Sequence, residues 1–305
     1  MAHAEGARGV KLQNGFILRE YLRPQVMPTT WCPGCGLGIV MSSIVQAVHH
    51  RGLAKRDVAM VSGIGCTGRM SGYVDFNTLH TTHGRAPAFA TGLKLARPDL
   101  NVLVVMGDGD SMSIGGNHLV HAMRRNIGLT AIVVNNAVYG LTGGQASPTT
   151  PVGGRTTTSR PGSFERPMNL EALARASGAS FFARATVNHT AAMVKLIERA
   201  LAVPGFSMVE IVSNCHVLYG RMNDLGDAAQ MMQGMEPTTR RVNPVLLRRA
   251  SMPQRLGALE APVENSDTPF TDDPRIQRGV IFERAPRDDY AQRYHAMVAE
   301  HTALP

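Results

Sequence analysis

"VLVVMGDGD" (residues 102–110) decides the fold. Its first five residues form a continuous apolar run, which ends at Gly107 in a polar, glycine-containing segment. A strand with one solvent-exposed face would alternate apolar and polar residues. An unbroken apolar run instead predicts a strand that is covered on both faces. Such strands are typical of parallel sheets with helices on both sides.

Similar runs recur along the chain, with helical patterns between them. We predict further strands at 58–62, 130–135, 180–184 and 207–213, and helices near 36–50, 87–96, 115–126, 169–177 and 189–203. This alternation predicts an α/β fold with a doubly wound, mostly parallel sheet. We divide the chain into an N-terminal arm (1–35), a central domain (36–218) and an irregular, Pro- and Arg-rich C-terminal extension (219–305). The extension holds a predicted strand at 279–283 and a short helix near 290–301.

Composition excludes several classes of protein. The 305 residues are 44% hydrophobic and carry a net charge of +8. The chain begins without a signal-peptide pattern and has no apolar run that could span a bilayer, so we expect a cytoplasmic protein without membrane contact. Scattered Arg residues and only 5% aromatics argue against nucleic-acid binding. The long aperiodic loop 140–168 is expected to be functional.

Chemically active residues follow the predicted strands. In a doubly wound sheet, ligands bind beyond the carboxyl ends of the strands. Cys66 follows the strand at 58–62, Asp108 follows 102–106, and Cys215 follows 207–213. A helix that precedes a parallel strand starts at the same edge, which adds Cys32 and Cys35. All four cysteines and the Gly-Asp-Gly loop are therefore predicted to share one edge of the sheet.

The Gly-Asp-Gly loop and the Asn pair that ends the next strand predict a metal and diphosphate site. The Asp108 carboxylate, the Asn136 amide oxygen and the Val138 carbonyl are the hard ligands that Mg²⁺ prefers, with a diphosphate and water completing its coordination. Gly107 and Gly109 let the backbone approach the phosphates, and a helix start near 115 adds a favourable dipole. A Gly-Asp-Gly turn alone is usually an ordinary strand end. The Asn pair that begins 26 residues after Gly109 makes the pattern typical of thiamine diphosphate sites.

The cysteines allow more than one interpretation. A redox dithiol at Cys32 and Cys35 is disfavoured because no strand precedes it and because it leaves the other two thiols unexplained. "GIGCTG" (63–68) matches a nucleotide-binding pattern by letter, but no helix-forming stretch follows it. Zinc and a 4Fe–4S cluster can each take four thiolates. The residues alone leave both open, and a cluster beside a thiamine site has a use in removing electrons.

Six motifs together resemble the β subunit of 2-oxoacid:ferredoxin oxidoreductases: "WCPGCG", "GIGCTGR", "HGRAPAFATG", "GDGD", "NNAVYGLTGGQ" and "NCH". The resemblance covers residues 24–220 closely and implies a thiamine diphosphate-binding fold. It implies that Cys32, Cys35, Cys66 and Cys215 bind one 4Fe–4S cluster, and that Asp108, Asn136 and Val138 hold Mg²⁺. Around thiamine diphosphate it implies Ile64, Gly65, Cys66, Thr67, His83, Gly84, Arg85, Gly109, Asp110, Gly140 and Leu141.

The resemblance also implies partners. No Glu in a recognisable motif could activate the aminopyrimidine, so an α subunit should complete the site, in an α2β2 assembly. The chain lacks a Cys-rich insert and resembles the single-cluster type. The implied reaction is coenzyme A-dependent oxidative decarboxylation of 2-oxoglutarate to succinyl-CoA and CO₂, with ferredoxin as electron acceptor, or its CO₂-fixing reverse. Alternatives are the same chemistry on pyruvate or other 2-oxo acids, or a non-redox thiamine decarboxylase or synthase with structural zinc.

Two residues are expected to contact the substrate. The resemblance is closest to members acting on 2-oxoglutarate, whose distal carboxylate needs a charged partner such as Arg69. Thr142 is expected to orient the keto-acid end. The alternative for Arg69 is a salt bridge to the α subunit, because Arg is common at interfaces.

Overall fold

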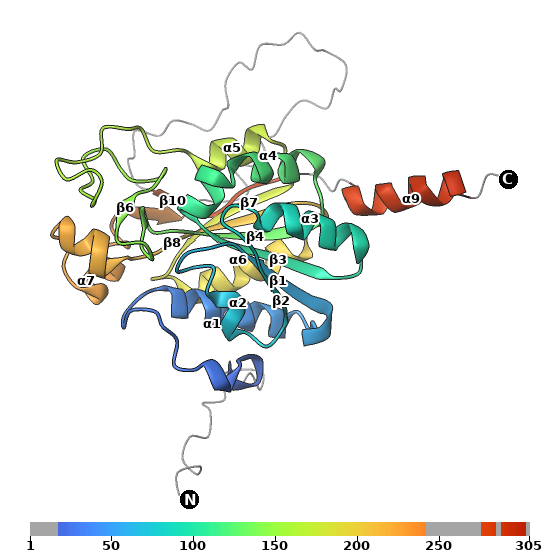
Figure 1. The fold of residues 1–305 in the computed structure, drawn as a ribbon, viewed down its shortest axis with the longest axis horizontal. Helices are drawn as coiled ribbons and strands as arrows, with labels where there is room; N and C mark the ends of the chain where they lie inside the picture. The colour runs from blue at the N-terminus through green and yellow to red at the C-terminus, as the bar shows by residue number, and fades with distance from the viewer. Residues whose placement is uncertain (1–17, 242–275, 285–287, 303–305) are drawn as a thin grey trace, which may run out of the picture.

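The chain folds around one eight-stranded sheet, seen in a computed structural model that describes residues 18–241, 276–284 and 288–302 (Figure 1). The strand order is β2-β1-β3-β4-β8-β7-β10-β9. The first six run parallel, and β10 pairs antiparallel with β7. The strands are β1 (Val58–Ser62), β2 (Asn77–His80), β3 (Asn101–Gly107), β4 (Leu129–Asn135), β7 (Phe181–Thr186), β8 (Ser207–Val212), β9 (Thr239–Arg241) and β10 (Ile276–Glu283).

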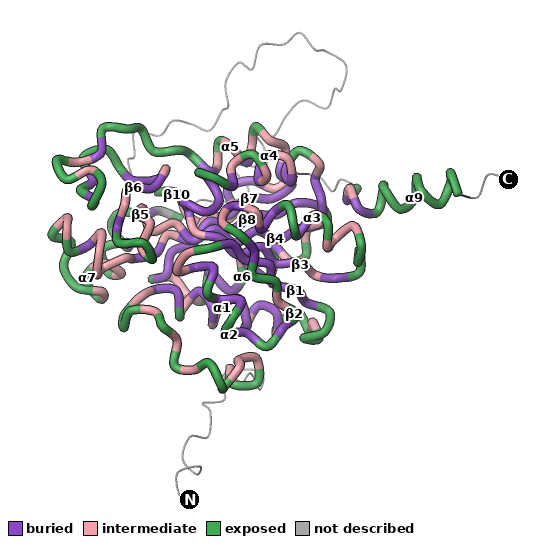
Figure 2. Tube along the Cα trace, viewed as in Figure 1, coloured by how far each residue is buried: buried purple, intermediate pink, exposed green. Residues whose placement is uncertain are grey.

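Alternate side chains of each central strand enter two different cores. Leu103 and Val105 of β3 belong to one core, while Val102, Val104 and Met106 belong to the other. The first core is covered by α1 (Leu37–His50) and α6 (Thr190–Ala202), and the second by α3 (Ala86–Ala96), α4 (Gly116–Arg125) and α5 (Leu170–Ala176). Buried residues accordingly concentrate along the sheet (Figure 2). This two-sided burial explains why the strands are apolar throughout.

The predicted α/β architecture is confirmed. All six predicted strands and six predicted helices occur, with ends shifted by at most a few residues, and the helix predicted near 290–301 is α9 (Tyr290–Thr302). Sequence patterns missed short elements: α2 (Met70–Tyr73), β2, the hairpin of β5 (Val138–Tyr139) and β6 (Gln145–Ala146), α7 (Ala228–Gln233) and β9. Edge strand β2 has no buried residue and α7 has none either. Without a buried face, neither element has an apolar pattern to detect.

The C-terminal extension contributes to the sheet. β10 lies beside β7, so part of the segment we separated as 219–305 is a strand of the main sheet. By contrast, α9 projects away from the body (Figure 1), and Ala291 is its one buried residue. None of the helices in the described part of the chain is both long and apolar enough to cross a membrane.

Candidate active site

The carboxyl ends of β1, β3, β4 and β8 meet at one edge, because these strands are parallel and adjacent. Beyond them lie the segments that begin at Gly63, Asp108, Asn136 and Ser213. Two of these segments continue as π-helical turns, Asp110–Ile114 after β3 and His216–Gly220 after β8. Such turns are rare in proteins as a whole, but those that occur are often found at functional sites. The edge predicted from the sequence is therefore present.

Three oxygen-bearing groups converge there, and we call Asp108, Asn136 and Val138 the oxygen cluster. A terminal atom of the Asn136 amide lies 2.8 Å from the Val138 carbonyl oxygen and 3.2 Å from Asp108 Oδ1. If that atom is nitrogen, it donates to both oxygens. If it is oxygen, it accepts from the Val138 amide at 3.3 Å and faces the other two oxygens, an arrangement that suits a cation. The donor set thus fits the predicted Mg²⁺, which binds carboxylate and carbonyl oxygens.

Asp108 is held firmly in this position. It is 2% exposed, and its Oδ2 accepts hydrogen bonds from Ser147 Oγ at 2.6 Å and Thr149 Oγ1 at 2.5 Å. Burial raises the pKa of Asp108, although the two hydroxyl donors act in the opposite direction. A cation at Oδ1 would favour the ionised carboxylate, since opposite charge stabilises the charged form.

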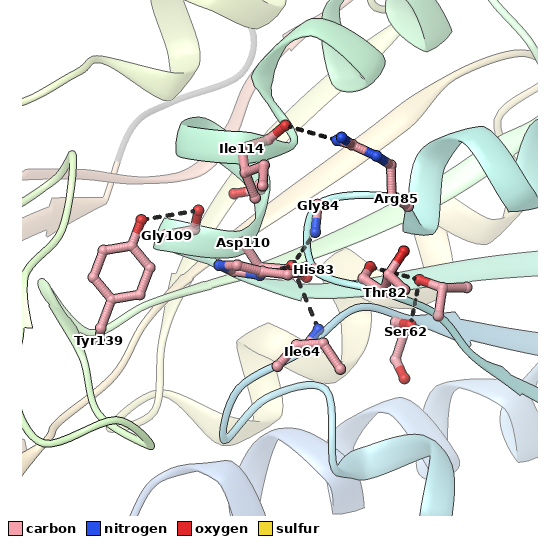
Figure 3. A network of polar contacts seen from close by, with 12 residues as sticks. Ser62, Ile64, Thr82, His83, Gly84, Arg85, Gly109, Asp110, Ile114 and Tyr139 are labelled. Atoms are coloured by element: carbon pink, nitrogen blue, oxygen red, sulfur yellow. Dashed lines mark hydrogen bonds and ion pairs between the residues drawn. The ribbon is translucent and has the colours of Figure 1, made fainter.

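Asp110 organises a second network at the same edge (Figure 3). Its Oδ1 lies 2.5 Å from His83 Nδ1 and accepts from the backbone amides of Gly84 at 2.6 Å and Ile64 at 3.4 Å. Its Oδ2 is buried and has no hydrogen-bond partner in the described part of the chain. Burial raises the pKa of Asp110. The carboxylate ties the segments after β1, β2 and β3 together, all of which were predicted to surround the cofactor.

Gly109 is required by a close approach. A Cβ at this position would lie 2.1 Å from Tyr139 Cε1, so a larger residue would force the Tyr139 ring to move. Tyr139 Oη donates to the Gly109 carbonyl at 3.4 Å, a long bond, and its ring meets His83 edge-on. Arg85 donates to the carbonyl of Ile114 at 3.3 Å, at the end of the π-helical turn that precedes α4 (Figure 3).

The four thiols, which we call the thiol cluster (Cys32, Cys35, Cys66, Cys215), are all free and lie near one another. Burial, together with the other three thiols, raises the pKa of Cys66 to about 11, while Arg69 acts in the opposite direction. Burial also raises the pKa of Cys35 and of Cys215. Trp31 Nε1 donates to the Cys66 carbonyl at 2.7 Å, which holds the two cysteine loops together.

Gly140 lies beside two of the thiols. A Cβ at Gly140 would lie 3.5 Å from Cys66 Sγ and 3.7 Å from Cys215 Sγ, which is ordinary van der Waals contact. Within residues 18–241, 276–284 and 288–302, no three His, Cys, Asp or Glu residues form a group that could hold one metal ion.

The two residues predicted to contact substrate are exposed. Arg69 precedes α2, and its charge acts on Cys66. Thr142 Oγ1 donates to Gln145 Oε1 at 2.6 Å, so its proton is already used within the β5–β6 loop. Their roles stay predictions. The other predicted cofactor-binding residues lie along the same edge; Gly65 and Gly107 are partly buried, Thr67 is buried, and Ile64 and Leu141 are 36% and 47% exposed.

Comparisons with known proteins identify the family. The family described as "Thiamine pyrophosphate enzyme, C-terminal TPP binding domain" matches residues 59–211. The 2-oxoglutarate synthase subunit KorB of Archaeoglobus fulgidus is 55% identical over 196 residues, which is 64% of this chain and 73% of that one. The KorB subunit of Methanothermobacter marburgensis is 49% identical over 217 residues, 71% and 76% of the two chains.

The chain belongs to the β subunits of the 2-oxoacid:ferredoxin oxidoreductases. A solved structure, the 2-oxoglutarate:ferredoxin oxidoreductase from Magnetococcus marinus with 2-oxoglutarate, coenzyme A and succinyl-CoA bound, is similar over 97% of this chain and 94% of that one. Its TM-score is 0.78 at 28% identity. The resemblance seen in the motifs and the predicted thiamine diphosphate-binding fold are thereby confirmed, and the chain is a subunit of an oxidoreductase.

Sequence reasoning missed the residues that support the oxygen cluster. Ser147 and Thr149 bind Asp108 from the loop 140–168, and Asn135 connects that loop to β8. The dense Ser and Thr content of the loop was the available signal. It could not show which hydroxyl reaches which carboxylate, because the contacts span about forty residues of aperiodic chain.

Proposed function

We propose that this β subunit binds the diphosphate half of thiamine diphosphate through Mg²⁺ held by Asp108, Asn136 and Val138. The observation that carries the proposal is the convergence of these three groups within 2.8 to 3.2 Å at the carboxyl edge of the sheet. The match to a thiamine pyrophosphate-binding family supports it. The network around Asp110 would fix the loops of Ile64 and His83 beside the cofactor.

The thiol cluster is proposed to bind one 4Fe–4S cluster. Each thiolate of such a cluster binds a different iron atom, whereas zinc holds all four sulfurs at about 2.3 Å from one centre. The electrostatic influence of the other three thiols on Cys66 places all four in one neighbourhood, and the match to β subunits of a ferredoxin-linked oxidoreductase supports the redox-active cluster. Because cysteines bind metals as thiolates, metal binding displaces protons, so loading should improve as pH rises.

The proposed reaction is the coenzyme A-dependent oxidation of 2-oxoglutarate to succinyl-CoA and CO₂, with ferredoxin as acceptor, and its CO₂-fixing reverse. Relatives named for 2-oxoglutarate and a solved neighbour with 2-oxoglutarate, coenzyme A and succinyl-CoA bound support this substrate. When bound, thiamine diphosphate supplies the nucleophilic carbon and accepts the electrons left as CO₂ departs.

The chain's own residues would position the reactants. Arg69 is a cation beside the thiol cluster and would bind the distal carboxylate of the substrate. Thr142 is proposed to contact the keto-acid end with its hydroxyl oxygen, since its proton is donated to Gln145. Asp108 would remain ionised once the cation offsets the cost of its burial.

A partner subunit is part of the proposal. Ile64 and Leu141, both exposed apolar residues at the carboxyl edge, would be covered by the cofactor and an α subunit that supplies the activating carboxylate. We propose an α2β2 enzyme in the cytoplasm.

The test is to purify the full chain anaerobically with its α partner and to measure iron, sulfide, zinc and thiamine diphosphate. We expect iron, sulfide and the cofactor, and ferredoxin reduction that requires 2-oxoglutarate and coenzyme A. Zinc without sulfide would overturn the redox assignment, and absence of thiamine diphosphate would overturn the whole proposal. As a control, the β subunit alone should not reduce a viologen dye with substrate.

A further inference from the structure

A buried ion pair lies behind the oxygen cluster, on the neighbouring strands β7 and β8. Arg184 Nε donates to Glu210 Oε2 at 2.7 Å, and the two side chains are 12% and 6% exposed. Arg184 also donates to the Gln277 carbonyl of β10 at 3.2 Å and lies 3.7 Å from Glu171. Two buried charges are costly to desolvate and are weak evidence for stability alone. The role of this ion pair is therefore sought in the other hydrogen bonds that Arg184 and Glu210 make.

Glu210 continues toward the site through Asn135, the last residue of β4. Asn135 Nδ2 donates to Glu210 Oε1 at 2.9 Å. This donation fixes the orientation of the amide, because its oxygen must then face the other way. There Asn135 Oδ1 lies 3.0 Å from Thr149 Oγ1, whose single proton is shared with Asp108 Oδ2 at 2.5 Å. A continuous chain of hydrogen bonds thus connects Arg184 to Asp108.

The same amide oxygen fixes the backbone between the metal-binding groups. Asn135 Oδ1 accepts from the amide of Ala137 at 3.2 Å, and Thr150 Oγ1 donates to the Ala137 carbonyl at 2.7 Å. Ala137 has a φ of 62°, a left-handed conformation that is unfavourable for a residue with a Cβ. Ala137 separates Asn136 from Val138, so its conformation decides whether their oxygens can meet Asp108.

We propose that Arg184, Glu210 and Asn135 act as a relay of positioning residues that holds Ala137 left-handed and thereby gathers the oxygen cluster. The relay rests on the proposed function, since the cluster is taken to bind Mg²⁺ and thiamine diphosphate. Arg184 orients Glu210, Glu210 orients the Asn135 amide, and the amide oxygen holds the Ala137 backbone. None of the three touches the ligands directly.

Glu210→Gln breaks the relay with little change of shape. Glu210 accepts hydrogen bonds from two donors, Arg184 Nε and Asn135 Nδ2, one at each carboxylate oxygen. The amide of Gln has an acceptor oxygen at one end only, so its NH₂ group would face the second donor. We expect the Kd of thiamine diphosphate in the presence of Mg²⁺ to rise about tenfold, at the lower end of the 10–100-fold typical of outer-shell changes at metal sites. Isothermal calorimetry on the apo complex of full chain and α partner measures this without turnover.

Ala137→Gly distinguishes a positioning role from a structural one. Glycine adopts a positive φ freely, so it removes the need for the relay to hold this backbone. In the background of Glu210→Gln, Ala137→Gly should recover part of the lost affinity. A merely structural loss would not be recovered by adding a glycine. Asn135→Ala, which changes no buried charge, provides a second variant if Glu210→Gln fails to fold, and it should show the same loss and recovery.

The matched control is Glu283→Gln. Glu283 accepts from Arg199 at 2.5 and 2.8 Å and also attaches β10 to the body, but it has no described connection to the oxygen cluster. It should lower the melting temperature and leave the Kd unchanged. Wild-type affinity in Glu210→Gln and Asn135→Ala, or no recovery with Ala137→Gly, would overturn the relay. If the wild-type complex itself shows no Mg²⁺-dependent binding, the proposed function fails with it.

Discussion

The oxygen cluster and the thiol cluster share one sheet edge but differ in how firmly the protein holds them. Asp108 is buried and bound by two hydroxyls, and its neighbours are fixed by hydrogen bonds from the loop 140–168. Among the thiols, Cys32 is exposed and the other three are partly buried. Several side-chain hydrogen bonds therefore fix the oxygen cluster. The cysteine loops are joined by the bond from Trp31 to the Cys66 carbonyl, and one of the four thiols is open to solvent.

Removal of Asp108 should have the largest effect. Asp108→Ala deletes the one charged ligand of a cation that demands full coordination. We expect the Kd of thiamine diphosphate with Mg²⁺ to rise more than about a hundredfold, beyond the usual outer-shell range, while iron content stays normal. Calorimetry and iron analysis on the same preparation measure both. If Asp108 only capped a helix, the result would be about 1 kcal/mol of lost stability and normal cofactor binding.

Removal of Cys66 should have the opposite pattern of effects, with iron lost and cofactor binding kept. Cys66→Ser removes one of four thiolates, so iron and ferredoxin reduction should be lost. Thiamine diphosphate should still bind, because the substitution leaves the oxygen cluster unchanged. Iron and sulfide analysis and cofactor calorimetry together test this separation. Loss of both iron and cofactor would show that the two clusters form one cooperative unit.

Arg69, beside the thiol cluster, should have an intermediate and substrate-dependent effect. Loss of a desolvated charge pair costs roughly 2–5 kcal/mol, so Arg69→Ala should lower kcat/KM for 2-oxoglutarate by about 30-fold or more. Pyruvate and 2-oxobutyrate lack the distal carboxylate and should be little affected. Steady-state ferredoxin reduction with the three substrates measures this. An equal fall for all three would assign Arg69 to the subunit interface instead.

Tyr139 should matter least, although it contacts the Gly-Asp-Gly loop. Its hydroxyl bond to Gly109 is 3.4 Å long, so Tyr139→Phe should lower the free energy of unfolding by no more than about 1 kcal/mol. Urea unfolding measures this value. A much larger fall would mean that the hydroxyl, and not the ring, supports the oxygen cluster.

The sequence predicted the fold and the edge of the sheet because both depend on strong local signals. The apolar run at 102–106 marks a strand buried on both faces, and residues after parallel strands must share an edge. The supporting network could not be predicted in this way. Thr149 reaches Asp108 across an aperiodic loop, and the Arg184–Glu210 pair lies on strands where a single charged residue interrupts each pattern.

The left-handed backbone at Ala137 could not be predicted from the sequence either. Left-handed positions are usually marked by Gly or Asn, and an alanine gives no such sign. The role of Asn135 was obscured because the Asn pair was interpreted through Asn136 alone. Its partners at Glu210 and Thr149 are distant in sequence, and only the folded sheet brings them together.

The contact between Gly109 and Tyr139 has a consequence for evolution and for protein engineering. Any side chain at position 109 collides with the ring at position 139, thirty residues away on the end of another strand. A larger residue at 109 should therefore be accepted more readily when 139 carries a smaller side chain. A mutant library that varies the Gly-Asp-Gly loop alone should favour glycine at 109, whereas joint variation of both sites would admit further sequences.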